Sequence, residues 1–121
     1  VLGKPVDYAD AVQMLQMLSG STHEVFTGVC ITRALIDERT GEIETEQTHA
    51  FVDATKVTFR TLEIAEIDYY IHHYAPYDKA GAYGIQEWIG YIGVEKIEGS
   101  FYNVMGFPIE RVYLALKQIG L

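Results

Sequence analysis

Apolar residues recur at helical spacing in three stretches of the chain. Asp7, a favourable N-cap residue, precedes the first stretch, and Gly20 stands where a helix commonly ends. Pro76 prevents the second stretch from continuing, and the third follows Pro108. Each stretch carries one apolar stripe, which is typical of a helix that covers a core. The expected helices span residues 8–19, 63–74 and 110–119.

The stretches between the helices read as strands. Residues 25–36 are rich in β-branched side chains and apolar on both faces, which predicts a central strand covered on both sides with Cys30 buried in it. The polar residues 37–42, with Gly41 at a position that favours positive φ, predict a hairpin loop. The polar side chains of the returning strand indicate one solvated face. The expected strands span residues 25–36, 43–52, 56–60 and 94–97.

Six glycines fall between Gly81 and Gly106, where short apolar runs alternate with turns. Within this stretch Ser100 is expected to cap a short helical turn that ends at residues 106–108. Helices and strands are interspersed along the chain, and at least one hairpin is present. The pattern therefore predicts an α/β or α+β domain, built on a mixed β-sheet flanked by helices.

Composition and charge exclude several classes of protein. The chain has 121 residues, of which 49% are hydrophobic and 21% charged, as expected for one folded globular domain or part of one. No run of about 18 apolar residues is present, which argues against a membrane span. The net charge of −8 and the scattered cations argue against nucleic-acid binding. The single cysteine excludes an internal disulfide and fits a reducing compartment, most simply the cytoplasm.

Most candidate catalytic residues carry little information. His72 and His73 are adjacent, so on a helix they project about 100° apart, and His23 and His49 read as surface or capping residues. The informative segment is residues 77–86, which contain a carboxylate, an ammonium group, two glycines and an amide. Such a segment is either a ligand-binding loop, because glycine admits close backbone approach, or a tight turn closed by an ion pair.

Four motifs, taken in their order along the chain, closely resemble the Maf family. Asp78-Lys79-Ala80-Gly81-Ala82-Tyr83-Gly84-Ile85-Gln86 is the most specific of them, whereas Leu2-Gly3-Lys4-Pro5 alone would be weak. The other two are Met14-Leu15 with Leu18-Ser19-Gly20 and His23-Glu24-Val25, and Gly99-Ser100 with Asn103-Val104, Gly106 and Pro108. The resemblance covers nearly the whole chain. It implies an α/β fold similar to inosine triphosphate pyrophosphatases, with a deep cleft between two lobes.

The resemblance also implies an activity. Maf-like proteins are nucleoside triphosphate pyrophosphatases that cleave between the α and β phosphates, use Mg²⁺ or Mn²⁺, and often form homodimers. They are regarded as house-cleaning enzymes, and their older name refers to septum formation. The implied substrates here are dTTP, UTP and modified pyrimidine nucleotides. Two alternatives stay open: the 7-methyl-GTP branch of the family, and a noncatalytic nucleotide-binding regulator of septum formation.

Site residues follow from the resemblance, position by position. Lys4 corresponds to a triphosphate contact and Gln86 to the position that selects the base. The other substrate-binding positions are Asp78, Lys79, Ala82, Tyr83 and Gly84, with Asp78 and Lys79 more readily a structural ion pair. No metal ligand is assigned. Glu87-Trp88 departs from the family, which commonly has glycine after the glutamine.

Two family features have no counterpart in these residues. The phosphate-gripping Ser-x-Ser-Pro-Arg-Arg loop and the aspartate proposed as general base would both precede Val1. Residues 1–121 are therefore expected to be the carboxy-terminal two-thirds of a single Maf-like domain. On this expectation the 121 residues alone are inactive or nearly so.

Overall fold

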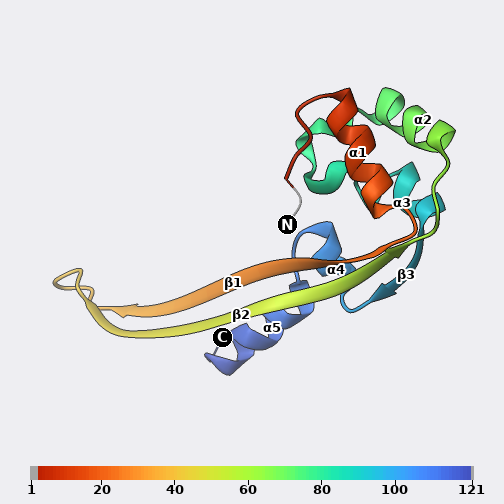
Figure 1. The fold of residues 1–121 in the computed structure, drawn as a ribbon. Coiled ribbons are helices and arrows are strands. Elements are labelled where there is room, and N and C mark those ends of the chain that lie inside the picture. The colour runs from red at the N-terminus through yellow and green to blue at the C-terminus, as the bar shows by residue number, and fades with distance from the viewer. Residues whose placement is uncertain (1–2, 121) are drawn as a thin grey trace.

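The computed structural model describes residues 3–120. A helical lobe occupies one end of the molecule, and a long two-stranded arm leads away from it (Figure 1). The lobe contains α1 (Tyr8–Leu18), α2 (Ile64–Tyr74), α3 (Trp88–Gly93) and two short 3-10 turns, η1 (Pro76–Asp78) and η2 (Ala80–Ala82). The sheet contains β1 (Thr22–Ile36), β2 (Ile43–Phe59) and β3 (Val94–Glu98). The last helices, α4 (Phe101–Met105) and α5 (Ile109–Gln118), lie along the sheet.

The predicted helices are confirmed with small changes at their ends. The Asp7 side chain caps α1 by accepting the Asp10 N–H at 2.8 Å, and Gly20 follows the helix with a φ of 66°. Glu63 and Glu66 form a capping box at the start of α2, and Ala75 ends that helix in the left-handed region. No helix among residues 3–120 is long and apolar enough to cross a bilayer.

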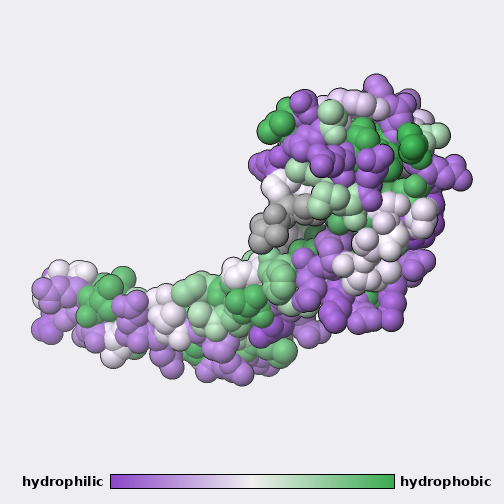
Figure 2. Space-filling view, in the orientation of Figure 1, coloured by the Kyte–Doolittle hydropathy of each residue, from purple (hydrophilic) through white to green (hydrophobic). Residues whose placement is uncertain are grey.

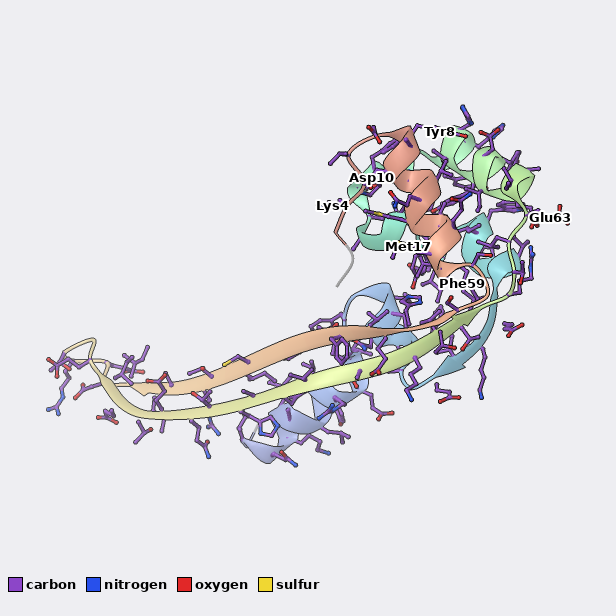
Figure 3. All side chains as sticks on the ribbon, in the orientation of Figure 1. Lys4, Tyr8, Asp10, Met17, Phe59 and Glu63 are labelled. Carbon is purple, nitrogen blue, oxygen red and sulfur yellow. The ribbon has the colours of Figure 1, made fainter. Side chains whose placement is uncertain are left out.

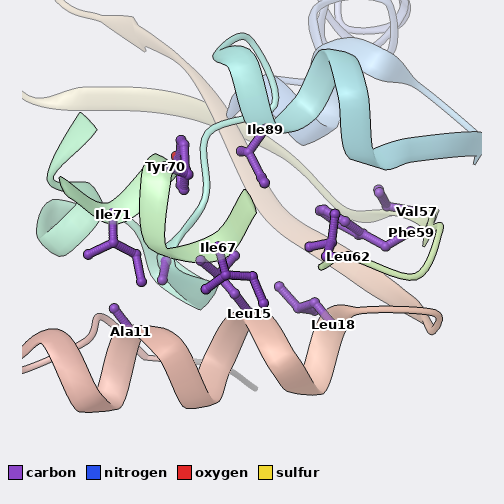
Figure 4. Packing of buried hydrophobic residues seen from close by; sticks show 11 residues of the cluster. Ala11, Leu15, Leu18, Val57, Phe59, Leu62, Ile67, Tyr70, Ile71 and Ile89 are labelled. Carbon is purple, nitrogen blue, oxygen red and sulfur yellow. The ribbon is translucent and has the colours of Figure 1, made fainter. Parts of the chain in front are cut away.

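The lobe core forms where the inward faces of α1 and α2 meet the end of the sheet (Figure 4). Tyr70 is fully buried, and Phe59 at the end of β2 is 1% exposed. The other members of this cluster are aliphatic side chains, chiefly Leu15, Leu18, Val57, Leu62, Ile67, Ile71 and Ile89. Burying each of the larger ones contributes about 1.5–3 kcal/mol before the entropy of ordering the chain is counted.

The sheet confirms an α/β arrangement with flanking helices, but its order differs from the prediction. Both pairings among the described strands, β1 with β2 and β2 with β3, are antiparallel, so β2 is central. The prediction that residues 25–36 form the central, doubly covered strand is therefore wrong. Half-buried and exposed positions alternate along β1, and Cys30 is exposed rather than buried. The β-branched residues that indicate a buried strand also suit an edge strand covered on one face.

Two predicted strands are one in the structure. Residues 43–52 and 56–60 join into β2 because the residues between them stay in the ladder, with Asp53 opposite Thr27 and Thr55 opposite Val25. Arg111 of α5 makes the buried carboxylate tolerable: its Nη1 lies 3.5 Å from Asp53 Oδ1 and donates to the Val52 carbonyl at 2.9 Å. Asp53 Oδ1 thus has a charged neighbour from 58 positions further along the sequence, while Oδ2 makes no hydrogen bond to the described residues.

Helix α3 is not predicted by the sequence pattern. Two of its six residues, Gly90 and Gly93, are glycines, which disfavour a helix by up to about 1 kcal/mol each relative to alanine. Packing stabilises it instead, because Ile89, Gly90 and Gly93 are all buried. The capped turn at Ser100 is confirmed as α4, whose Asn103 N–H donates to the Ser100 hydroxyl at 3.2 Å.

Candidate functional site

A cleft of about 910 Å³ lies where the lobe meets the sheet. This volume falls within the range of small-molecule sites. The surface is hollowed at the junction between the rounded lobe and the narrow arm (Figure 2). One wall is the start of β1, the second is the loop from Lys79 to Glu87, and the third is the end of α4. The lining residues are Thr22, His23, Glu24, Val25, Phe26, Lys79, Ala80, Gly81, Tyr83, Gly84, Ile85, Gln86, Glu87, Val104 and Met105.

The structure brings together four of the seven predicted site residues. Lys79, Tyr83, Gly84 and Gln86 line the cleft. Ala82 is fully buried in the lobe core instead. Its backbone has a φ of 64°, a value that residues other than glycine rarely adopt. The remaining two residues, Lys4 and Asp78, are exposed and lie outside the lining. Leu2 of the first motif and the aspartate expected before Val1 lie outside the described residues.

The segment that contains Lys4 is nevertheless tied to the cleft loop. The Gly81 N–H donates to the Gly3 carbonyl at 3.0 Å, and the loop turns there because Gly81 has a φ of 73°. The Lys79 ammonium is the main cause that lowers the pKa of the Asp78 carboxyl, and the Lys4 charge adds to it. Lys4 therefore lies on the lobe (Figure 3), one residue after the backbone contact with the cleft loop.

A buried tyrosine holds the cleft loop in place. The Gly84 N–H donates to the Tyr70 hydroxyl at 3.1 Å, and this hydroxyl donates to Glu87 Oε1 at 3.2 Å. The Lys79 ammonium lies 3.4 Å from the same Glu87 oxygen and 3.2 Å from Asp78 Oδ1. The predicted Asp78–Lys79 ion pair is thus present and extends to Glu87, the residue that departs from the family pattern. Burial raises the pKa of Tyr70, so the hydroxyl stays protonated and able to donate.

Gly84 is part of this arrangement because it leaves space. A Cβ at this position would clash with Glu87 Oε1 and lie 2.9 Å from the Cε of Lys79. Because Gly84 has no Cβ, the Lys79 and Glu87 side chains can pass close to its backbone and form their ion pair. This network fixes both ends of the segment that carries Gln86.

We expect Tyr70→Phe to lower stability by about 1–3 kcal/mol, since it leaves the Gly84 N–H and a Glu87 oxygen without their buried partner. Chemical denaturation followed by Trp88 fluorescence measures the change. Tyr74→Phe is the matched control, because Tyr74 is exposed and stacks on Tyr70. Equal stability of the two variants would contradict the role given to the Tyr70 hydroxyl.

His23 lies in a Maf motif, but sequence reasoning assigned it no role in the site. Its Nε2 lies 2.8 Å from the Tyr83 hydroxyl, and the two rings meet edge to face. Burial lowers the pKa of His23, an effect that the Val57 backbone partly opposes, so the imidazole is neutral at pH 7. Burial also raises the pKa of Tyr83 to about 12. A period-two reading of β1, which places His23 on the same face as Val25, would have pointed it inward.

Asn103 positions the third wall. Its Nδ2 donates to the Val25 carbonyl of β1 at 3.1 Å and to the Thr55 hydroxyl of β2 at 3.0 Å. The side chain is fully buried, so α4 cannot slide along the sheet without breaking these bonds. Val104 and Met105, the next two residues, thereby reach the cleft as part of an apolar surface that also includes Val25, Phe26 and Ile85.

The charges that line the cleft do not match a polyphosphate. Glu24 and Glu87 are acidic, and Lys79 is the one Lys or Arg among the described lining residues. Lys79 is already paired with two carboxylates. The described walls therefore suit a neutral ring with hydrogen-bonding edges better than a chain of phosphates.

The described residues also lack a set of metal ligands. Among residues 3–120 no group of three or more histidine, cysteine or acidic side chains could hold an ion. Mg²⁺ needs only one or two protein carboxylates when the phosphates of a bound ligand supply its other oxygen ligands. We assign no ligand to it within this chain.

Comparison with known proteins identifies the family. A sequence model described as "Maf-like protein" matches residues 1–119. The chain belongs to the Maf family. Its most specific Maf motif, residues 78–86, is the segment that forms the loop wall of the cleft.

Several relatives carry the same name. The chain is 52% identical over 120 residues to a dTTP/UTP pyrophosphatase of Porphyromonas gingivalis, covering 99% of this chain and 55% of that protein. It is 50% identical over 118 residues to a dTTP/UTP pyrophosphatase of Bacteroides fragilis, covering 98% and 55%. A dTTP/UTP pyrophosphatase of Flavobacterium psychrophilum is 50% identical over 115 residues, covering 95% and 53%. The chain thus spans about half the length of the curated relatives it matches.

Proposed function

We propose that the protein is a nucleoside triphosphate pyrophosphatase that acts on dTTP and UTP. In this reaction water attacks the α phosphorus, the bond to the bridging oxygen breaks, and a nucleoside monophosphate and pyrophosphate are released. The observation that carries the proposal is the position of Gln86, which lies in the cleft beside an apolar wall, on the loop formed by the Maf motif. The family membership and the names of the relatives support it.

The chemistry of the glutamine side chain favours a pyrimidine. Its amide offers both a donor and an acceptor, whereas a carboxylate only accepts. Uracil and thymine present an N3–H between two carbonyl oxygens, so one amide can pair with the N3–H and a neighbouring carbonyl. The apolar side chains from β1 and α4 would cover the faces of the ring. We therefore place the base, rather than the phosphates, against the described walls.

The triphosphate requires positive charge from other sources. It carries about four negative charges, and the leaving pyrophosphate gains charge in the transition state, so cations lower the barrier. Lys79 is already paired with two carboxylates, so Lys4 is the better candidate of the predicted set for a phosphate contact, and we propose that Mg²⁺ or Mn²⁺ accompanies the substrate. Modified pyrimidine nucleotides would enter the same cleft, consistent with a house-cleaning role in the cytoplasm.

A nucleotide panel on the whole protein tests the proposal. Eight substrates, the four common ribonucleoside and four deoxyribonucleoside triphosphates, are supplied with Mg²⁺, together with 7-methyl-GTP, and pyrophosphate is resolved from single phosphate. We expect UTP and dTTP to have the highest kcat/KM, with pyrophosphate as the product. Release of single phosphate, or a preference for 7-methyl-GTP, would contradict the proposal.

A further inference from the structure

One side-chain hydrogen bond joins the β1 wall of the cleft to its loop wall among the described residues. It runs between His23 Nε2 on β1 and the Tyr83 hydroxyl on the loop, at 2.8 Å. Both residues line the cleft, and Tyr83 precedes Gln86 by three positions on the same loop. The bond therefore lies beside the glutamine that the proposed function assigns to the base.

The surroundings of the pair leave it little freedom. The buried Phe59 ring packs edge to face against Tyr83, with centroids 5.1 Å apart, and lies 5.9 Å from the His23 ring. The other ring nitrogen, His23 Nδ1, is buried and makes no hydrogen bond to a side chain of the described residues. Phe59 thus supports both rings from the core side, and the Tyr83 hydroxyl is the side-chain partner of the imidazole.

Both groups are neutral near pH 7, which keeps the hydroxyl available to a ligand. The pKa of His23 is lowered and that of Tyr83 is raised to about 12, in both cases chiefly by burial. A phenol hydroxyl can donate one hydrogen bond and can also accept. If His23 Nε2 carries the proton, the Tyr83 hydroxyl accepts from it and can still donate to a ligand. If Nε2 is unprotonated, the hydroxyl donates to it and can still accept from a ligand.

We propose, on the basis of the function above, that Tyr83 makes a second polar contact to the pyrimidine nucleotide beside Gln86 and that His23 is the positioning residue for the Tyr83 hydroxyl. A hydroxyl held in place before binding loses less freedom when the nucleotide enters, which favours affinity. His23 itself acts through Tyr83 rather than on the reacting phosphate.

Four variants of the whole protein test this role: His23→Leu, His23→Gln, Tyr83→Phe and the double variant His23→Leu/Tyr83→Phe. The readouts are KM and kcat for UTP and the melting temperature. We expect His23→Leu and Tyr83→Phe each to raise KM about tenfold, with kcat changed less than about twofold. The double variant should be no worse than either single variant, because both remove the same contact. His23→Gln, whose amide can occupy the Nε2 position, should restore most of the affinity.

Two exposed positions provide matched controls. His73→Leu and Tyr91→Phe make the same chemical changes on α2 and α3, away from the cleft lining, and should leave KM unchanged. A lower melting temperature with unchanged KM in both His23→Leu and Tyr83→Phe would assign the pair a structural role only and overturn the inference. Multiplicative effects in the double variant would also overturn it. A wild-type protein that releases no pyrophosphate from UTP or dTTP would instead contradict the proposed function itself, and the inference with it.

Discussion

Replacing Gly90 with alanine is expected to destabilise the lobe by about 3 kcal/mol or more. A Cβ on Gly90 would lie 2.6 Å from the Ile85 carbonyl carbon and closer still to its oxygen. Both are backbone atoms, so a change of rotamer cannot relieve the overlap. Either α3 or residues 85–87 must move. Because the two segments are adjacent in the chain, either movement displaces Gln86. We expect the melting temperature to fall by about 10 °C and nucleotide affinity to be lost.

Gly28→Ala is the matched control for this substitution. Gly28 lies in β1, and a Cβ there would meet no atom within 4 Å. The change should therefore alter stability by no more than about 0.5 kcal/mol. Scanning calorimetry of the two variants measures the difference. Similar melting temperatures would show that the packing between α3 and Ile85 is less tight than the structure indicates.

Gln86→Glu is expected to reduce kcat/KM for UTP and dTTP about 100-fold while the fold is kept. A carboxylate cannot donate to a carbonyl of the base, so that oxygen would be buried without a partner. The carboxylate also adds negative charge to a cleft that already holds Glu24 and Glu87, which opposes a polyanionic substrate. Because the Gln86 side chain is exposed, its replacement should not disturb the core.

Steady-state kinetics on the nucleotide panel measures this loss. Gln13→Glu, an identical change at an exposed position of α1, is the control for net charge and should behave as the wild type. If the variant gains activity toward 7-methyl-GTP as it loses UTP, the base-selecting role of the position is supported. An unchanged substrate profile would contradict that role.

The sequence predicts the elements whose signal is local. Asp7 and Gly20 bound α1, and the stripe from Ile64 to Tyr74 gives α2, because caps and helical spacing act within a few residues. Elements that depend on distant contacts are not predicted. Helix α3 exists in spite of its glycines, and β2 continues through Asp53, beside which Arg111 lies. These pairings join residues far apart in the sequence and leave no local pattern.

The candidate site also combines a part with a local sequence signal and a part that depends on distant contacts. The loop that carries Lys79, Tyr83, Gly84 and Gln86 could be found from one contiguous motif. His23-Glu24-Val25 on the opposing wall also belongs to a Maf motif, but its contact with Tyr83 could not be found, because the two residues are sixty positions apart in the sequence. Tyr70 and Glu87, which hold the loop, gave no motif signal either. Their roles appear only when the fold brings α2 against the loop.

The most direct test of the account is a crystal structure of the whole protein with α,β-imido-dUTP, whose bridging nitrogen resists cleavage between these phosphates. We expect the uracil ring in the cleft, between the apolar side chains of β1 and α4, with the Gln86 amide within hydrogen-bond distance of N3 and a neighbouring carbonyl oxygen. A uracil ring bound elsewhere, or a Gln86 side chain turned to solvent in the complex, would contradict the account.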